Sequence, residues 1–168
     1  MNVFELLTFS CQKFIFQRND ASLADGVRRS ALVSDSATLS AAQIAAIRGA
    51  DTCFVASAAA GGADASHRGG RAGFVRVSGG GRRLSLASYP GNGIFNTEGN
   101  VLAEGRAGAL FVDWRSGRTI QVSGRAAIDF LEPGGARQMD GCERIIDIDI
   151  ERVVEIERKL SEPLAMGN

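Results

Sequence analysis

Residues 66–97 read S-H-R-G-G-R-A-G-F-V-R-V, then a triple glycine and a short alternating segment, and finally Y-P-G-N-G-I-F-N-T. Glycine lets backbone come close to a neighbouring strand or ligand, and clustered arginines suit phosphate. Between Thr52 and Thr97 the only acid is Asp64, whereas the same stretch holds five arginines and His67, the one histidine of the chain. This local excess of positive charge predicts a site for an anionic ligand, and we favour a phosphorylated cofactor.

The length and composition outside this stretch indicate one ordinary globular domain. The chain has 168 residues, 45% of them hydrophobic, and its formal net charge is zero, which argues against a general nucleic-acid binder. Cys11, Cys53 and Cys142 are too few and too widely spaced for a disulfide framework or a zinc site, so we expect a reducing, cytoplasmic compartment and no metal. The apolar residues near the start include Glu5 and are interrupted by Gln12 and Lys13, so we expect neither a signal peptide nor a membrane span.

The pattern of apolar residues and turn signals predicts a mainly β fold with few helices. Ser40 and Gln43 have the spacing of a capping box, which predicts a helix from Ala41 to Arg48. We expect a second helix within residues 92–103, a loop at residues 19–37, and a final strand or helix at residues 153–160. The predicted strands are residues 52–58, 73–77, 84–88, 107–114, 119–130 and 146–150. Short strands at close spacing favour a small β-barrel with flanking helices over a doubly wound sheet.

The arginines and the histidine each leave two interpretations open. Arg68, Arg71 and Arg76 have no acid beside them in sequence, so they indicate either an anion site or a solvated basic face. His67 could contact a ligand, act as a general base or lie on the surface. No serine–histidine–acid pattern and no P-loop accompany it.

Small polar residues supply a further group of candidates. Asn92, Asn96 and Thr97 fall at the start of the second expected helix, where they could hold phosphate or simply cap the helix. Gln121 and Ser123 share one face of the longest expected strand, which faces either water or a ligand.

Three segments in this order resemble the pyridoxamine 5'-phosphate oxidase-like FMN-binding split barrels. They are residues 66–77, the P-G-N and F-N-T-x-G-N motifs of residues 89–100, and the L-F-V-D-W, S-G-R and Q-V-S-G-R-A motifs of residues 108–126. The resemblance covers roughly residues 51–130 and implies a six-stranded split β-barrel with flanking helices. It also implies a homodimer that holds FMN at the subunit interface.

The resemblance assigns roles to residues of this chain. Phe74, Val75 and Arg76 correspond to the strand that lies against the flavin ring. The candidates for cofactor contact are Ser66, His67, Arg68, Phe74, Val75, Arg76, Asn92, Asn96, Thr97, Gln121 and Ser123, the last two approaching from either subunit. His67 is the candidate for a catalytic residue, and no other catalytic group is assigned.

The chain also departs from the family. Ala72 replaces a usual proline and Glu98 a usual leucine, and the tail reads E-R-K-L-S-E-P without the tryptophan of pyridoxamine phosphate oxidases proper. We therefore expect an FMN-dependent oxidoreductase that transfers hydride through flavin N5 to or from another small molecule, with no membrane or nucleic-acid partner. The alternative is a module that binds flavin, haem or deazaflavin without a reaction.

The resemblance divides the chain into two parts. Residues 38–168 form the expected split-barrel domain. Residues 1–37 are an expected N-terminal extension that covers the partner subunit.

Overall fold

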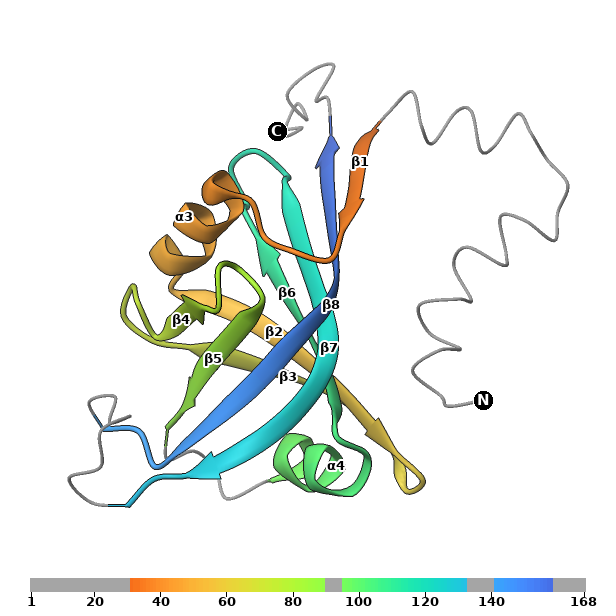
Figure 1. Ribbon diagram of the computed structural model, residues 1–168, viewed down its shortest axis with the longest axis vertical. Coiled ribbons are helices and arrows are strands. Elements are labelled where there is room, and N and C mark those ends of the chain that lie inside the picture. Colours follow the sequence, from red (N-terminus) through yellow and green to blue (C-terminus); the bar gives the residue numbers. More distant parts are fainter. Residues whose placement is uncertain (1–30, 90–94, 133–140, 159–168) are drawn as a thin grey trace, which may run out of the picture.

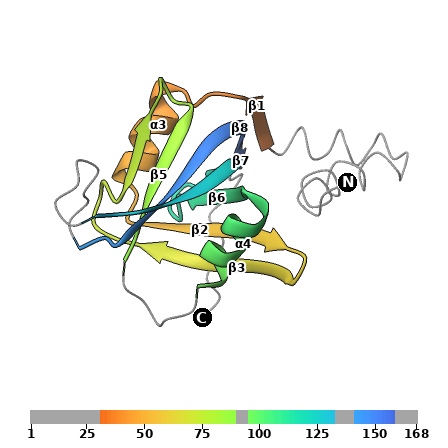
Figure 2. The same cartoon turned by 60° about the horizontal axis from the view of Figure 1, so that its bottom comes forward.

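The fold is a single strongly curved antiparallel sheet with a helix at each end. The computed structural model describes residues 31–89, 95–132 and 141–158, and Figures 1 and 2 show it from two directions. The strands are β1 (Ala31–Ser36), β2 (Thr52–Ala59), β3 (Gly62–Gly69), β4 (Val75–Ser78), β5 (Arg83–Ser88), β6 (Arg106–Val112), β7 (Thr119–Phe130) and β8 (Arg144–Arg158). The helices in this part of the chain are α3 (Ala41–Gly49) and α4 (Asn96–Glu104).

The order of the strands places β8 at the point where the sheet divides. The main path is β3-β2-β6-β7-β8-β5-β4, and β1 pairs separately with β8. One edge of β8 pairs with β7 along nearly its whole length. Its other edge pairs first with β5, over Arg144–Asp149, and then with β1, over Val153–Arg158. One long strand therefore joins two smaller sets of strands, which is the division expected of a split barrel.

A bulge bends the long β7–β8 pair near its middle. The register between these strands shifts between Ser123 and Gly124. A Cβ atom at position 124 would lie 1.8 Å from the backbone oxygen of Asp149, a distance that no side chain tolerates. Gly124 is therefore required for the close approach of the two strands, as its position inside a predicted strand indicated.

Helix α3 begins with the capping box predicted from the sequence. The Ser40 side chain accepts a hydrogen bond from the Gln43 amide, and the Gln43 side chain accepts one from the Ser40 amide. The β4–β5 turn packs against this helix start, because the Leu39 amide donates to the oxygen of Gly81 at 3.0 Å. Gly81 has φ +89°, and a Cβ atom there would lie 2.7 Å from the oxygen of Leu39. Glycine thus allows the hairpin to reach the helix.

The inner face of the sheet carries one main hydrophobic core. Fully buried side chains come from β2, β4, β5, β7 and β8, and include Val55, Val75, Leu86, Val122 and Ile148. Alternation along each strand puts these residues on one face. Helices α3 and α4 close the two ends with Ile47 and Val101, both buried.

The predicted fold class is confirmed, and most predicted elements match the structure. Strand β7 has the predicted bounds, and the polar-to-apolar alternation of residues 146–150 lies within β8. Residues 153–158 continue as strand. One prediction was wrong: residues 31–36, expected in a loop, pair with β8. Residues 62–69, for which no strand was predicted, form β3. Among the described residues no helix is both long and apolar enough to cross a membrane.

Candidate functional site

A pocket of about 500 Å³ opens between β3, the end of β5, the start of α4 and the start of β8. Its volume lies within the range of about 300–1,000 Å³ that is usual for small-molecule sites. Polar and charged side chains make up most of its wall. The lining residues are Asp64, Ser66, His67, Arg68, Gly69, Ala87, Ser88, Tyr89, Phe95, Asn96, Thr97, Glu98 and Arg144.

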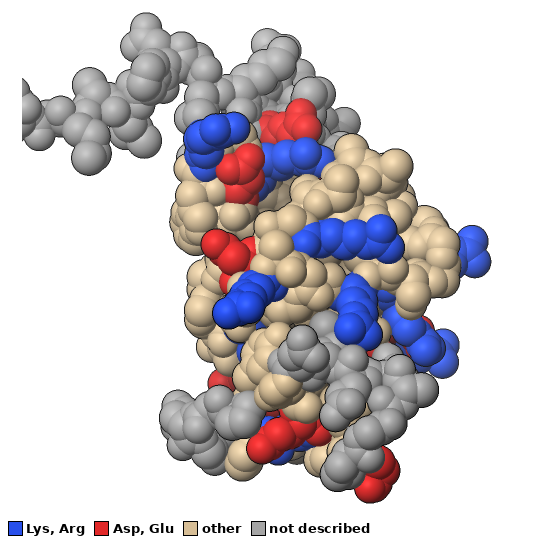
Figure 3. All heavy atoms as spheres, turned by 90° about the vertical axis from the view of Figure 1, so that its left-hand side faces the viewer, with Lys and Arg blue, Asp and Glu red and all other residues tan. Residues whose placement is uncertain are grey.

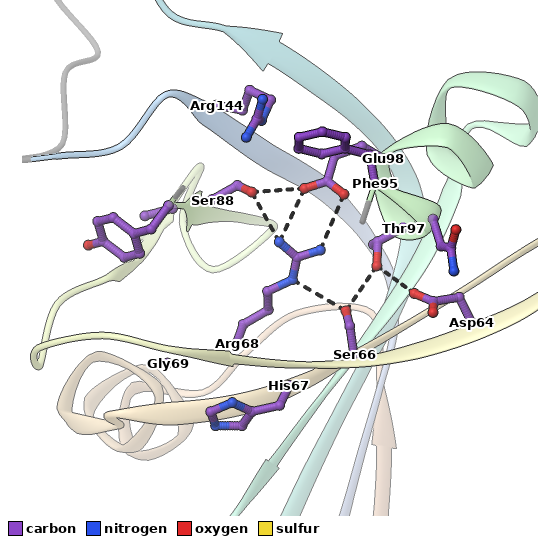
Figure 4. Close-up of a pocket in the computed structure, with 13 residues that line it drawn as sticks. Asp64, Ser66, His67, Arg68, Gly69, Ser88, Phe95, Thr97, Glu98 and Arg144 are labelled. Carbon is purple, nitrogen blue, oxygen red and sulfur yellow. Dashed lines mark hydrogen bonds and ion pairs between the residues drawn. The ribbon is translucent and has the colours of Figure 1, made fainter. Parts of the chain in front are cut away.

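Strand alternation decides which residues of β3 face this pocket. Asp64, Ser66 and Arg68 are half-buried and alternate with exposed neighbours. Figure 4 shows Ser66 and Arg68 pointing toward α4, whereas the His67 ring lies on the other side of the strand. There His67 Nε2 lies 2.5 Å from the Thr52 hydroxyl, and its ring meets the Phe54 ring edge-on. The imidazole therefore faces away from the polar network of the pocket.

The Arg68 side chain links its own strand, β3, to β5 and α4. Its Nη1 donates to Glu98 Oε1 at 3.1 Å and to Ser88 Oγ at 3.0 Å, and its Nη2 donates to Glu98 Oε2 at 3.3 Å. Its Nε donates to Ser66 Oγ at 3.3 Å. Each of the three nitrogens of the guanidinium thus has a partner inside the protein, as Figure 4 shows. This arrangement corrects the sequence-based picture of Arg68 as an arginine with no acid to pair it.

Glu98 completes this network from the first turn of α4. Its side chain is only 6% exposed, and Ser88 also donates to its Oε1, at 2.8 Å. Burial alone would raise the pKa of Glu98, but hydrogen bonds from Arg68, Ser88 and its own backbone amide outweigh burial and lower the pKa below its ordinary value. The first turn of a helix also favours a negative charge. Glu98 is therefore a carboxylate that holds Arg68 in place.

Thr97 joins the network to Asp64. Its hydroxyl donates to Asp64 Oδ2 at 2.6 Å and lies 2.9 Å from the hydroxyl of Ser66. The start of α4 is thereby fastened to β3 by side chains. The cap residue Phe95 itself makes no side-chain cap hydrogen bond.

Arg144 lines the pocket from the start of β8, and its contacts differ from those of Arg68. Its Nη2 pairs with Glu143 Oε2 at 3.0 Å, and Glu143 is 55% exposed. Its guanidinium carbon lies 4.7 Å from the centre of the Phe95 ring, a cation–π distance. Its Nε is buried and has no hydrogen-bond partner among the described residues. A buried donor in that state costs free energy unless something binds it.

The structure brings together some of the predicted site residues and separates others. Ser66, His67, Arg68, Asn96 and Thr97 all line the pocket. The side chains of Phe74 and Val75 lie in the hydrophobic core instead. Asn92 falls outside the described residues.

The remaining predicted residues lie elsewhere on the surface. Arg76 and Gln121 are exposed, Ser123 is half-buried, and none of the three lines the pocket. Arg71 is exposed as well. In the space-filling view of the face that carries α3 and the β4–β5 hairpin (Figure 3), basic side chains spread over the middle and acidic ones lie mostly toward the two ends. Part of the basic stretch therefore forms a solvated face.

Four polar residues of the pocket were missed by the sequence reasoning: Asp64, Ser88, Glu98 and Arg144. The alternation of Asp64, Ser66 and Arg68 was a usable signal, because it is the period of a strand with one polar face. In the sequence, Glu98 stands out only as a departure from the family pattern. Nothing near Arg144 in sequence indicates that it reaches this pocket.

The pocket has no cluster of metal ligands and no reactive thiol in the part of the chain that the structure describes. No group of three or more His, Cys, Asp or Glu residues is placed to hold a metal there. Cys53 pairs with Arg68 across the β2–β3 ladder and is fully buried. Burial raises the pKa of its thiol to about 12, against a smaller lowering by Arg68. Cys53 is therefore a core residue.

Comparison with known proteins supports the fold and not the chemistry. No protein-family model matches the chain, and no curated protein matches it by sequence. Among solved structures, a single-site variant of HupZ from Group A Streptococcus matches with a TM-score of 0.54 and 16% identity, over 69% of this chain and 98% of that one. A protein from Lactobacillus delbrueckii, provisionally assigned as a pyridoxamine 5'-phosphate oxidase, matches with a TM-score of 0.54 and 14% identity, over 70% and 94%.

A third match is weaker. A FAD-binding protein from Mesorhizobium loti has a TM-score of 0.46 and 18% identity, over 76% of this chain and 97% of that one, which is too low a likeness to support an argument. At these identities the two better matches establish the fold alone. The chain therefore has the split-barrel fold of these proteins.

Proposed function

We propose that this chain binds FMN in the pocket between β3, α4 and β8 and acts as an oxidoreductase on a small molecule. The main observation behind the proposal is that residues from separate parts of the sequence meet in one pocket. Ser66, Arg68, Asn96 and Thr97 come from two separate motifs of the family resemblance, and all four line one pocket of about 500 Å³. A split-barrel fold with such a pocket is the setting that the resemblance implies for a flavin.

The residues of the pocket fit a flavin nucleotide in size and in donors. The unpartnered Nε of Arg144 is a donor for an anionic ligand. The hydroxyls of Ser66 and Thr97 line the same pocket and are already hydrogen-bonded within the protein. Tyr89 and Phe95 supply aromatic surface on the wall. The two carboxylates there, Asp64 and Glu98, are already hydrogen-bonded within the protein.

The protein would bind, orient and shield its ligand rather than exchange protons with it. A bound flavin supplies hydride acceptance and donation, so no acid–base triad is needed. The Arg68–Glu98 network keeps β3, β5 and α4 at fixed positions around the pocket. His67 faces away from that network, so we assign the reaction to no side chain of this chain.

We also propose a homodimer with the pocket near its interface. Gln121 and Ser123, which the resemblance places beside the flavin, are not part of this chain's own pocket. In a dimer, Gln121 and Ser123 of one subunit would contact the flavin bound in the pocket of the other subunit. Light scattering after gel filtration tests this: a monomer in solution would remove Gln121 and Ser123 from the site.

The absorption spectrum of the purified full chain is the first test of cofactor binding. We expect a flavin spectrum, and release of FMN rather than FAD when the protein is denatured. Ser66→Ala should weaken FMN binding about tenfold, since it removes a hydroxyl from the wall, whereas Ser78→Ala, at an exposed position outside the pocket, should not. A colourless protein that ignores added FMN would refute the proposal.

A binding module without a reaction is the second candidate. It is favoured by the orientation of His67 and by the engagement of Asp64 and Glu98 in internal hydrogen bonds. Reduction of the bound flavin by a nicotinamide donor, followed by reoxidation with a small-molecule acceptor, separates the two. Flavin that stays oxidised with every donor would favour the module.

A further inference from the structure

Among the described residues two arginines line the pocket, and only one of them is held by a buried carboxylate. We propose that Arg144, at the start of β8, is the residue that binds the phosphate group of the ligand, while Arg68 is a structural residue held by Glu98. This inference rests on the pocket of the proposed function but not on the ligand being a flavin. The sequence pointed to Arg68 and gave Arg144 no role.

Arg68 is unsuited to bind a phosphate because its partners are internal and charged. Glu98 contacts both Nη1 and Nη2, at 3.1 and 3.3 Å, and is itself nearly buried. A phosphate that took these donors would leave the Glu98 carboxylate buried without its counter-ion, which is strongly unfavourable. The third nitrogen, Nε, donates to Ser66 Oγ at 3.3 Å. An incoming anion therefore meets a guanidinium whose charge is already neutralised.

Arg144 presents the opposite case. Among the described residues its acidic partner is Glu143, which is 55% exposed while the Arg144 side chain is 15% exposed. An ion pair whose acid is open to water holds the arginine less strongly than a buried carboxylate does. Its Nε is buried without a partner among the described residues. Contact with the Phe95 ring holds the plane of the guanidinium in place without using any N–H group. The side chain is thus positioned in advance and keeps an unsatisfied donor.

The charges on the wall indicate what kind of ligand fits. Arg68 and Glu98 neutralise each other, and Asp64 accepts from Thr97. Asp64 keeps its negative charge, because its partner Thr97 is neutral. Arg144 is the lining arginine that no buried carboxylate holds, which predicts a ligand with one phosphate group bound on the Arg144 side of the pocket. Charge-assisted hydrogen bonds from arginine suit such a group.

The test is a titration with inorganic phosphate, followed by NMR of the arginine Nε–Hε groups in the full chain. The resonances of Arg144 and Arg68 are assigned through Arg144→Lys and Arg68→Lys. We expect phosphate at millimolar concentrations to shift the Arg144 resonance and leave that of Arg68 nearly unmoved. Arg144→Gln should weaken phosphate binding about tenfold, the value of one charge-assisted hydrogen bond. Arg71→Gln, which removes an exposed arginine outside the pocket, should change it less than twofold.

Shifts at Arg68 without shifts at Arg144, or no shifts at either, would overturn the proposal. A parallel titration with FMN and riboflavin separates it from the proposed function. Phosphate binding at Arg144 in a protein that binds neither flavin would leave this inference standing and remove the flavin. Equal affinity for FMN and riboflavin that does not change in Arg144→Gln would leave flavin binding standing and remove Arg144 as the residue that binds phosphate.

Discussion

The two walls of the pocket carry one arginine each, and the two arginines differ in how their charge is paired within the protein. On the β3 wall, Arg68 is enclosed by Glu98, Ser88 and Ser66, with a partner on each nitrogen. On the β8 wall, Arg144 has an exposed acid on one side and an unpartnered, buried Nε. The comparison teaches that a guanidinium in a pocket is available to a ligand only when no buried carboxylate already holds it.

A cysteine near each arginine extends the same contrast. Cys53 is the cross-strand neighbour of Arg68 and is fully buried. Cys142 is half-buried, and its thiol donates to the backbone oxygen of Arg144 at 2.6 Å. The β3 wall is thus backed by packed core, whereas the β8 wall begins at the surface.

Thiol labelling measures that difference most directly. Burial lifts the pKa of Cys53 from its ordinary value of 9.0 to about 12. Since only the thiolate reacts, this lowers the reactive fraction about a thousandfold at neutral pH, before shielding by the core is counted. In a Cys11→Ser background we expect a thiol reagent to modify the half-buried Cys142 much faster than Cys53, as measured by mass spectrometry of peptides. Similar rates in the folded protein would show that the Arg68 wall opens.

Removing each arginine should have unequal effects on stability. Arg68→Met leaves the Glu98 carboxylate buried without a counter-ion, so we expect the free energy of unfolding to fall by about 3 kcal/mol. Arg144→Met removes an ion pair whose acid is 55% exposed, although Arg144 itself is 15% exposed, and it should cost less, about 1 kcal/mol. Urea denaturation of both variants provides the measurement.

A double variant checks the cause of the loss. Arg68→Met combined with Glu98→Leu replaces the pair by apolar side chains and should recover much of the lost stability. If Arg68→Met were no less stable than Arg144→Met, the two walls would not differ as described.

Neutralising Glu98 should make the two walls more alike. In Glu98→Gln, Arg68 keeps its charge but loses its carboxylate, so we expect phosphate to bind about fivefold more tightly and to shift the Arg68 Nε–Hε resonance as well. Glu143→Gln is the matched control on the other wall. Because Glu143 is 55% exposed, its change should alter phosphate affinity less than twofold. Unaltered affinity in Glu98→Gln would mean that Glu98 does not limit Arg68.

The pH dependence of stability gives the smallest expected effect. The pKa of Glu98 in the folded state lies below its ordinary value of 4.5, because the hydrogen bonds from Arg68 and Ser88 outweigh burial. The ionised carboxylate therefore stabilises the fold above about pH 4.5, and this stabilisation is lost as the pH falls through the folded-state pKa. We expect Glu98→Gln to lose less stability than the wild type on acidification.

Glu155 allows the acid effect to be assigned to a site. Its pKa is lowered as well, with hydrogen bonds from Arg118 and Gln43 outweighing burial, at the α3 end of the sheet. Glu155→Gln should therefore remove a separate part of the acid sensitivity. If Glu98→Gln and Glu155→Gln behaved like the wild type in urea denaturation at low pH, these two carboxylates would not account for the loss of stability in acid.

Local patterns in the sequence were sufficient for most elements of the fold. The capping box at Ser40 and Gln43, the glycine turn before β5, and the alternation in β7 and β8 each depend on neighbours within a few residues. Strand β3 was missed because small residues and glycines dilute its apolar pattern, although Asp64, Ser66 and Arg68 alternate. Strand β1 was missed because its pairing partner, β8, lies at the other end of the chain.

The sequence alone determined that this chain folds as a curved β-sheet with short helices and that residues 66–97 concentrate basic and small polar groups, because periodicity, turns and composition are local properties. Only the tertiary structure decided which charges cancel. Arg68 meets Glu98 across 30 residues of chain, and Arg144 arrives at the same pocket from β8. Ion pairing depends on distance and burial, which strand pairing sets and sequence separation does not.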